Sequence, residues 1–326
     1  MALRPVLLAI AVLPMSLVAC GGDDQPIPEG MHYHYVASSV LVPTTNTQSR
    51  EYGLDLNADG TPDNQLGMVL SQLAGMGFKI QDTIDTAIAE GSIILLADIQ
   101  TKDFTNTTAA GIQVFLGDKA TAMPAPCSGT EAYDPTTKTG CKHHLDGSGV
   151  FGISSSSPMD AALRGKFVNG TFTAGPGDLT LQIALGGTDA IELDLIGARA
   201  KATGVTESMI GTATSGGIIL AGAITKDDID KKVIPAVQKQ LVPIIMRDCN
   251  MLTAPPGCGC GADTTGKTII GLFDTSHDCA VSEDEIKNNN LIMSLLSPDV
   301  TIDGKMALSL GIKASAVKGS FTPPGQ

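Results

Sequence analysis

The chain of 326 residues contains no tryptophan, and aromatic residues make up only 4% of it. Surfaces that stack sugars or nucleic-acid bases depend on aromatic side chains, so the composition disfavours both kinds of surface. Basic residues are also scarce, because 21 lysines and arginines stand against 34 aspartates and glutamates, a formal net charge of −13. An acidic surface repels nucleic acid and attracts cations. We therefore expect no nucleic-acid partner.

Common catalytic signatures are missing as well. The chain has neither a GxSxG elbow nor an HExxH pair. Ser315 and Lys318 spell SxxK, but they lie in alternating sequence that predicts a strand rather than the start of a helix. The sequence favours a non-enzymatic protein. It leaves open a hydrolase built from scattered residues.

Only one long apolar run is present, from Pro5 to Val18 after Arg4. It is too short to span a bilayer and is typical of a secretory signal. Its end, Leu17-Val18-Ala19-Cys20, resembles the lipobox of bacterial lipoproteins. The resemblance implies that residues 1–19 are a signal peptide, that Cys20 receives a diacylglyceryl group, and that a fatty acid such as palmitate acylates the new amine. The alternative is an ordinary signal peptide with a chance cysteine.

Several acyl chains on one residue give stable membrane anchoring. Gly21, rather than Asp, follows the cysteine, which in the enteric sorting rule favours the outer membrane. Residues 20–30 are rich in Gly, Pro and acid and predict a flexible tether. We expect the mature chain to be an exported protein attached to the outer membrane through its lipid.

The mature body divides into three expected parts: a sheet-rich domain over 31–248, a Cys-rich segment over 249–300, and strands over 301–326 that return to the sheet. Apolar spacing predicts two short helices between Gln65 and Ala89, a helix from Thr225, and another over 282–296. Alternation predicts strands at 93–96, 111–116, 163–172, 179–185, 191–195 and 306–321, with a hairpin turn at the sequence GGTD. The fold class is α+β, mainly antiparallel sheet, as a sandwich or a curved sheet, with packed helices.

Six cysteines remain beyond Cys20, and an even number in an exported chain predicts three disulfides. One is expected to staple loop 127–141, where a crosslink is worth about 3 kcal/mol in the chain-entropy model. The other four allow three pairings that the sequence leaves open. A zinc site is the rival interpretation, although the spacing is not that of paired CxxC motifs. The cysteines are Cys127, Cys141, Cys249, Cys258, Cys260 and Cys279.

The strongest functional motif is DTSHDCAVSEDE, which resembles the twelve-residue calcium loop of an EF-hand. A hard cation takes six to eight oxygen ligands, and such a loop aims alternate groups inward. The resemblance implies the ligands Asp274, Ser276, Asp278, Ala280 through its carbonyl, Ser282 and Glu285. Cys279 stands where the motif needs glycine for a sharp turn, so a disulfide would have to impose that turn or would replace the ion. The alternative is a capping box formed by Ser282 and Glu285.

A second stretch, DLNADGTPDN, resembles the calcium loops of exported repeats. The resemblance implies ligands at Asp55, Asn57, Asp59 and Asp63, with Gly60 at the turn. Leu66 occupies the twelfth position, so a carboxylate from elsewhere would be required. The alternative is a solvated turn before a helix. Both loops predict Ca²⁺ as a structural ion.

Residues 261–268, GADTTGKT, have the spelling of a phosphate-binding P-loop. A true P-loop joins a buried strand to a helix, whereas TAPPGCGC precedes this one. We therefore expect no nucleotide. Four histidines form adjacent pairs that could bind a transition metal, but ordinary hydrogen-bonded histidines are the simpler interpretation: His32, His34, His143 and His144.

The sequence thus favours a calcium-braced, outer-membrane-anchored lipoprotein that is not an enzyme and acts in envelope structure or extracellular binding with an unknown partner. One alternative is an exported hydrolase stabilised by calcium. Another is a carrier of a small apolar ligand, for which an apolar cavity would speak.

Overall fold

The computed structural model describes residues 25–75, 78–159, 162–183, 191–212, 214–250 and 258–323. The expected lipobox, Cys20 and the first part of the tether lie outside these residues. Within the described part of the chain, no helix is both long enough and apolar enough to cross a membrane.

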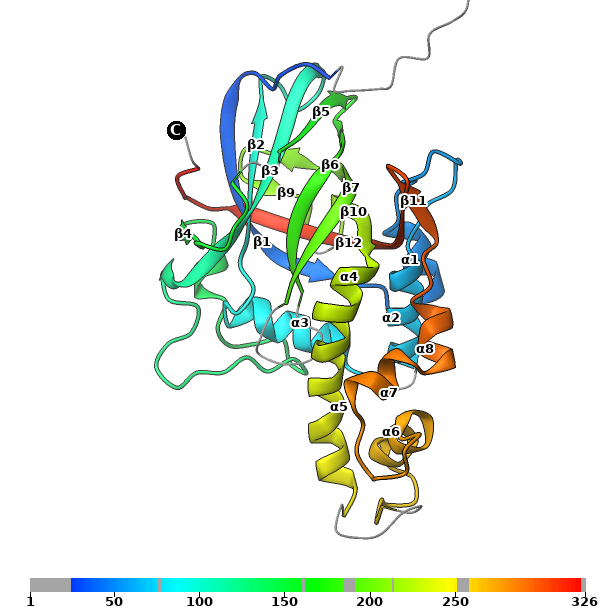
Figure 1. Ribbon diagram of the computed structural model, residues 1–326. Coiled ribbons are helices and arrows are strands. Elements are labelled where there is room, and N and C mark those ends of the chain that lie inside the picture. Colours follow the sequence, from blue (N-terminus) through cyan, green and yellow to red (C-terminus); the bar gives the residue numbers. More distant parts are fainter. Residues whose placement is uncertain are drawn as a thin grey trace, which may run out of the picture.

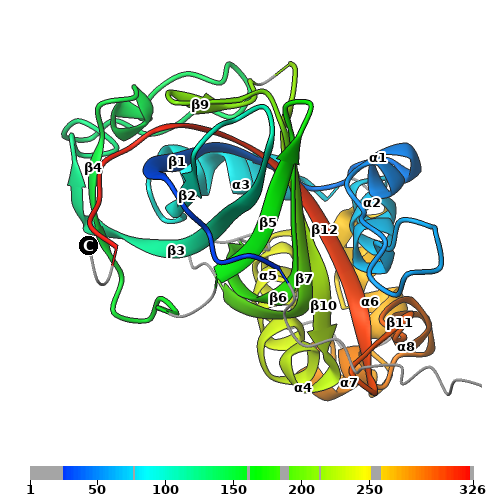
Figure 2. The same cartoon turned by 90° about the horizontal axis from the view of Figure 1, so that it is seen from above.

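The core of the molecule is an antiparallel sheet that closes into a barrel, seen end-on in Figure 2. Neighbouring strands pair in the order β1-β2-β3-β5-β6-β7-β10-β12, and β12 pairs back to β1. The barrel strands are β1 (Met31–Leu41), β2 (Leu95–Thr101), β3 (Thr107–Met123), β5 (Ala162–Val168), β6 (Thr171–Ile183), β7 (Ile191–Thr203), β10 (Gly217–Thr225) and β12 (Lys305–Lys318). Short strands β4 (Val150–Ile153), β8 (Val205–Thr206), β9 (Met209–Ile210) and β11 (Val300–Ile302) extend its edges.

Successive side chains along each strand point to opposite faces of the sheet, and both faces carry apolar clusters. The register aligns Ile99 with Ile112 and Ile112 with Leu163, so these side chains form a row on the inner face. The opposite face carries a smaller cluster that includes Val36, and Phe151 and Phe321 cover it. The inner face is the main core.

Large side chains fill the barrel. Tyr35, Phe167 and Phe172 are at most 1% exposed, and the rings of Phe167 and Phe172 lie 5.0 Å apart between centroids. Helix α3 (Ile80–Ala89) packs beneath one end of the barrel and buries Ile84 and Ile88 in the same cluster. A barrel of eight strands has an interior that side chains can fill.

The remaining helices gather beside that end of the barrel, as Figure 1 shows. We call α2 and α5–α8 the helical layer. Its long member, α5, follows a π-helical turn (Ile229–Val233) that directly precedes Pro235. The helices are α1 (Asn46–Glu51), α2 (Gln65–Gly75), α4 (Lys226–Asp228), α5 (Ile234–Asp248), α6 (Thr265–Phe273), α7 (Glu283–Lys287) and α8 (Asn290–Leu295), with a 3-10 turn at His143–Leu145.

The predicted class, α+β with mainly antiparallel sheet, is confirmed. The sheet is a closed barrel rather than a sandwich, because β12 returns beside β1. The expected GGTD turn lies outside the described residues, although the strands on either side of it, β6 and β7, do pair.

Two segment predictions were wrong. The expected strand 163–172 is a hairpin of β5 and β6, because Asn169 and Gly170 adopt positive φ and turn the chain. The expected helix 282–296 is broken into α7 and α8. Asn288 is the C-cap of α7. Asn289 caps α8, since its Oδ1 accepts a hydrogen bond from the Ile292 amide at 3.3 Å.

Candidate functional site

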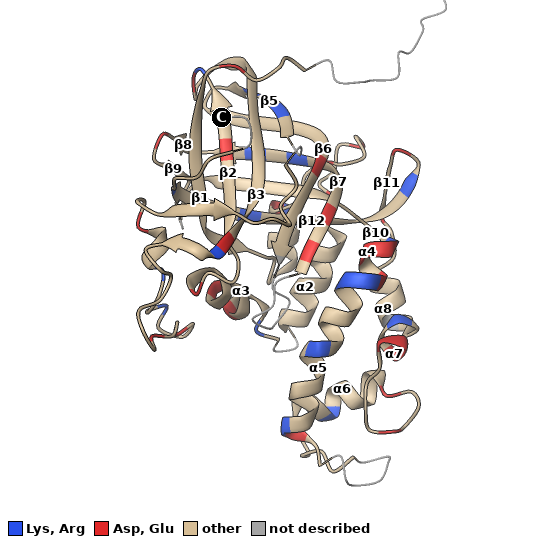
Figure 3. Ribbon diagram, turned by 60° about the vertical axis from the view of Figure 1, so that its left-hand side comes forward, with Lys and Arg blue, Asp and Glu red and all other residues tan. Residues whose placement is uncertain are grey.

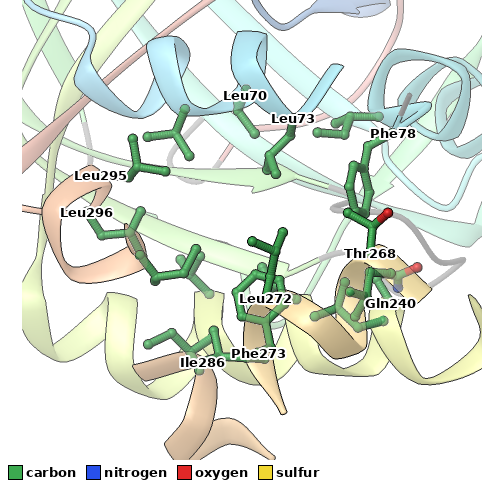
Figure 4. Close-up of a pocket in the computed structure, with 18 of the residues that line it drawn as sticks. Leu70, Leu73, Phe78, Gln240, Thr268, Leu272, Phe273, Ile286, Leu295 and Leu296 are labelled. Atoms are coloured by element: carbon green, nitrogen blue, oxygen red, sulfur yellow. The ribbon is translucent and has the colours of Figure 1, made fainter. Parts of the chain in front are cut away.

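The helical layer encloses an apolar cavity of about 260 Å³ against the sheet. Leu70 and Leu73 of α2 form one wall, and Leu295 of α8 closes one end (Figure 4). Leu272 of α6 lies between them, and Ile286 of α7 lies below it. The side chains therefore leave a largely enclosed apolar space inside an otherwise packed layer.

Polar groups lie at the opposite end of the cavity. Figure 4 places Thr268 of α6 and Gln240 of α5 on the side away from Leu295 and Leu296. Asp263, Thr264 and Thr265 complete this polar rim, which we call the mouth together with Thr268 and Gln240. All other lining residues within the described part of the chain are apolar.

The P-loop spelling is part of this mouth. Thr264 caps α6, because its Oγ1 accepts a hydrogen bond from the Lys267 amide at 3.3 Å. Residues 258–263, just before the cap, form turns and bends rather than a strand. Lys267 Nζ donates to the Ala262 carbonyl at 3.0 Å. The stretch is a capped helix start with a local lysine contact.

Three disulfides are present, and two of them lie in the helical layer. Cys249–Cys260 joins the end of α5 to the turn before α6, and Cys258–Cys279 joins that turn to the loop after α6. The sequence leaves three pairings of these four cysteines open, and the structure has the pairing Cys249–Cys260 and Cys258–Cys279. These two disulfides also leave no free thiolates at these four positions for a zinc site. The third disulfide, Cys127–Cys141, closes the loop between β3 and β4.

The loop over 274–285 connects α6 to α7, so the segment that precedes it is a helix. Asp274 is only 6% exposed. Its Oδ1 accepts a hydrogen bond from the Asp278 amide at 3.0 Å, and its Oδ2 accepts one from the Cys279 amide at 2.9 Å. Oxygen atoms of Asp274, Asp278 and Glu285 all lie within 4.8 Å of one another. That spacing fits oxygens around one calcium ion, whose ligands lie at about 2.3–2.6 Å.

Glu285 holds the end of this loop. Burial would raise the pKa of its carboxyl, but hydrogen bonds from the amides of Ser282 and Ser276 outweigh burial and lower the pKa to about 2. Ser282 Oγ in turn accepts from the Glu285 amide at 3.2 Å, which completes a capping box. Glu285 therefore closes the loop through hydrogen bonds of its own.

The loop over 55–63 has the same backbone. Asp55 Oδ1 accepts from the Asp59 amide at 3.2 Å, and its Oδ2 accepts from the Gly60 amide at 2.9 Å. Positive φ occurs at the fourth and sixth positions of both loops, at Ala58 and Gly60 here and at His277 and Cys279 in the other. A cysteine thus adopts the turn that glycine makes in the first loop. The Cys258–Cys279 bond holds it there.

The two loops differ in how their carboxylates converge. Among the described residues, the groupings of acidic, histidine and cysteine side chains within 4.8 Å include the 274–285 loop but not Asp55, Asp59 and Asp63. Asp63 Oδ2 instead accepts a hydrogen bond from the Leu56 amide at 2.7 Å. Burial raises the pKa of Asp63, and the carboxylates of Asp299 and Asp59 raise it further, while the Leu56 hydrogen bond opposes them. Asn57 Oδ1 accepts from the Asp59 amide at 3.0 Å.

The paired histidines lie apart from this region, and three of the four lie beside carboxylates. His32 Nδ1 lies 2.8 Å from Asp98 Oδ2, and His143 Nε2 lies 2.8 Å from Glu131 Oε2. His34 lies 3.7 Å from the other Asp98 oxygen. In the described part of the chain, no cluster of three potential metal ligands contains a histidine. His144 is 1% exposed, and burial lowers its pKa to about 4.

The cavity is the feature that sequence reasoning missed. Its lining comes from segments as far apart as Leu66 and Leu310, and each segment shows only ordinary apolar spacing. Comparisons of the chain with family models, curated proteins and solved structures find no match. The function of the protein is therefore inferred from the cavity and the two acidic loops.

Proposed function

We propose that this chain is a binding protein that holds a small apolar ligand in the cavity of the helical layer. The observation that carries the proposal is the apolar cavity of about 260 Å³, which opens to solvent at its polar mouth. Ligand sites are typically concave and apolar with a few polar groups, at about 300–1,000 Å³. The cavity lies just below that range, which suits a small ligand.

The apolar lining supports a binding role. The cavity opens to solvent at its mouth, where Asp263 and Thr268 are exposed, and its lining residue Leu272 is 38% exposed. An apolar ligand in the cavity would remove apolar surface from water, which is favourable by about 25 cal/mol per Å².

The lining disfavours catalysis in this cavity. Asp263 is the single titratable side chain among its described lining residues, and it is exposed at the mouth. General acid–base and nucleophilic chemistry need positioned groups with matched pKa values. A binding role therefore fits this site better than the alternative of a hydrolase.

Calcium enters the proposal as a brace for one wall of the cavity. Leu272 of α6 and Ile286 of α7 line the cavity, and the Asp274–Glu285 loop connects their helices. The matching motif, the shared loop backbone and the clustered carboxylates support Ca²⁺ as the ion. The Asp55–Asp63 loop is a second proposed site, with a further ligand still needed.

Outer-membrane anchoring through Cys20 also stays a proposal, and the Leu17–Cys20 motif supports it. Globomycin-sensitive processing that is lost in Cys20→Ser would support lipid attachment. Unchanged processing in that variant would contradict it. An anchored binding protein of this kind would present its cavity to ligands outside the cytoplasm.

The binding claim is tested with 1-aminonaphthalene, a neutral fluorescent probe whose ten ring carbons suit the cavity. The chain from Gly21 onward, which lacks the expected signal peptide and Cys20, keeps every described residue and needs no detergent. We expect saturable binding with a Kd of about 10–100 µM. The variants Leu73→Trp and Leu272→Trp fill the cavity and should each weaken binding at least tenfold. Met246→Trp is the matched control, because Met246 is 65% exposed and does not line the cavity. Binding that is absent, or that survives both filled variants, would overturn the proposal.

A further inference from the structure

We infer that the cavity selects a neutral, single-chain amphiphile of about ten carbons, such as a medium-chain alcohol, with its hydroxyl group at the mouth. This inference rests on the proposed function and names the class of its ligand. It follows from the one-sided placement of polar groups, the charge at the mouth and the volume of the cavity.

The polar groups occupy one end only. Thr268 and Gln240 face the cavity from two different helices on the same side, and Leu295 and Leu296 close the far side (Figure 4). A wholly apolar ligand would cover the half-buried Gln240 amide without giving it a hydrogen bond, which costs free energy. A ligand with one polar end matches both ends of the cavity in a single orientation.

The mouth offers hydrogen bonds rather than a cation. Threonine hydroxyls and a glutamine amide can each donate and accept. Thr268 Oγ1 donates to the Thr264 carbonyl at 3.5 Å, which leaves its lone pairs to accept a hydrogen bond from a ligand hydroxyl. A hydroxyl head group can likewise donate a hydrogen bond to these groups or accept one from them.

The charge at the mouth disfavours an anionic head. Asp263 is the charged lining residue in the described part of the chain, and it is negative. The nearest lysine in sequence, Lys267, does not line the cavity and donates to the Ala262 carbonyl. A fatty-acid carboxylate would therefore meet a like charge and no lysine or arginine. A quaternary ammonium head would gain only a weak, exposed attraction and could form no hydrogen bond.

The volume sets the length of the chain. An apolar cavity of about 150 Å³ accommodates a six-carbon aromatic ring in a well-studied protein. On that scale, 260 Å³ holds roughly ten carbons. A ten-carbon chain would place its terminal methyl near Leu295 when its head lies at Thr268.

The test displaces bound 1-aminonaphthalene with 1-decanol and with decanoate at pH 7. Decanol is more hydrophobic than decanoate in any case, so the decisive comparison is between variants. Asp263→Asn should tighten decanoate about threefold and leave decanol unchanged, since one exposed like-charge contact is worth up to about 1 kcal/mol. Thr268→Val should weaken decanol about three- to tenfold, the effect of one lost hydrogen bond, and leave the probe unchanged.

Matched controls are Thr301→Val and Asp303→Asn, two exposed positions of the β11–β12 hairpin outside the cavity. If Thr268→Val leaves decanol affinity unchanged, or Asp263→Asn leaves decanoate affinity unchanged, the inferred orientation and charge selection are wrong while the binding cavity stands. If decanol fails to displace a probe that does bind, the ligand class is wrong. If no probe binds to the wild-type chain, the proposed function itself fails.

Discussion

The barrel and the helical layer are both built from apolar side chains, yet only the barrel is filled. The rings of Phe167 and Phe172 pack against each other in a tilted arrangement inside the barrel. In the helical layer, leucines of α2, α6 and α8 surround about 260 Å³ that they do not occupy. The same kind of residue thus gives a scaffold in one region and a binding space in the other.

The two regions also differ in what holds them together. The barrel has continuous strand pairing around a closed ring. The helical layer contains helices of 15 residues or fewer, and short helices are marginal without support. Two disulfides and two side-chain caps supply that support around α6 and α7. Changes in the barrel should therefore affect stability most, and changes in the layer should affect binding most.

The ribbon in Figure 3 is coloured at charged residues on the helical layer as well as on the barrel, so charge alone does not separate the two regions.

The largest expected effect is a core truncation in the barrel. Phe172→Ala should lower the free energy of unfolding by about 3–5 kcal/mol, because it removes a fully buried ring. Leu272→Ala, at a cavity position that is 38% exposed, should lower it by less than about 1.5 kcal/mol. Urea unfolding of both variants measures the difference. Equal losses would contradict the contrast between the two interiors.

Disulfide removal should separate stability from binding. Replacing Cys258 and Cys279 together by alanine should cost about 3 kcal/mol and weaken probe binding, since the bond fixes the loop behind the cavity wall. Replacing Cys127 and Cys141 by alanine should cost a similar amount. Only the first pair should change the Kd for 1-aminonaphthalene. A binding loss in both pairs would show that the helical layer is not independently braced.

Calcium should stabilise the layer by a smaller amount. With a Kd of about 10⁻³ M, 10 mM calcium should add about 1.4 kcal/mol of stability over a sample in chelator. Glu285→Gln should abolish the heat of calcium binding at that loop, and Asp59→Ala should abolish the heat at the other, as measured by calorimetry. Glu283→Gln, an exposed neighbour outside the ligand set, is the control. Full heats in Glu285→Gln would exclude the ion from the 274–285 loop.

The smallest expected effect is an acid sensitivity at His144, on the barrel side. Its pKa falls from 6.5 to about 4 because the ring is buried, and the charges of His143 and Lys119 contribute. The folded state therefore keeps the ring neutral while the unfolded chain takes up a proton. Stability is fully present above pH 6.5 and is lost as the pH falls towards 4. His144→Phe should remove this part of the pH dependence, because phenylalanine takes up no proton.

Denaturant titrations at pH 7 and pH 4.5 would measure that difference, with the exposed His277→Asn as control, because asparagine tolerates the positive φ at that position. An unchanged pH dependence in His144→Phe would contradict the assignment. Probe binding should follow stability in both variants, because His144 lies outside the cavity lining.

Local patterns in the sequence predict much of the fold. The break between α2 and α3, the strands around Ile112 and Leu181, and the helix from Thr225 all follow from spacing and caps. Barrel closure does not, because Tyr35 pairs with Lys318 across most of the chain and no local pattern encodes that pairing. The turn at Asn169 and Gly170 has a recognisable hairpin signal, but the continuous apolar alternation on both sides of it favours a single strand.

The candidate site is predictable only in part. The Asp274 and Asp55 loops are visible as motifs because their residues are contiguous. The cavity depends on how the five helices of the helical layer meet the sheet. Leucines that touch one another have the same spacing in the sequence as leucines that leave a space between them. Volume is a property of packing, so spacing alone cannot reveal it.

The most direct test of the account is a crystal structure of the chain from Gly21 onward, soaked with 10-bromodecan-1-ol, with the bromine located by its anomalous signal. The account predicts a bromine peak inside the cavity near Leu295 and Leu296, with the hydroxyl group at Thr268. A bromine peak only outside the helical layer, or no ordered ligand at a concentration that saturates probe displacement in solution, would contradict it.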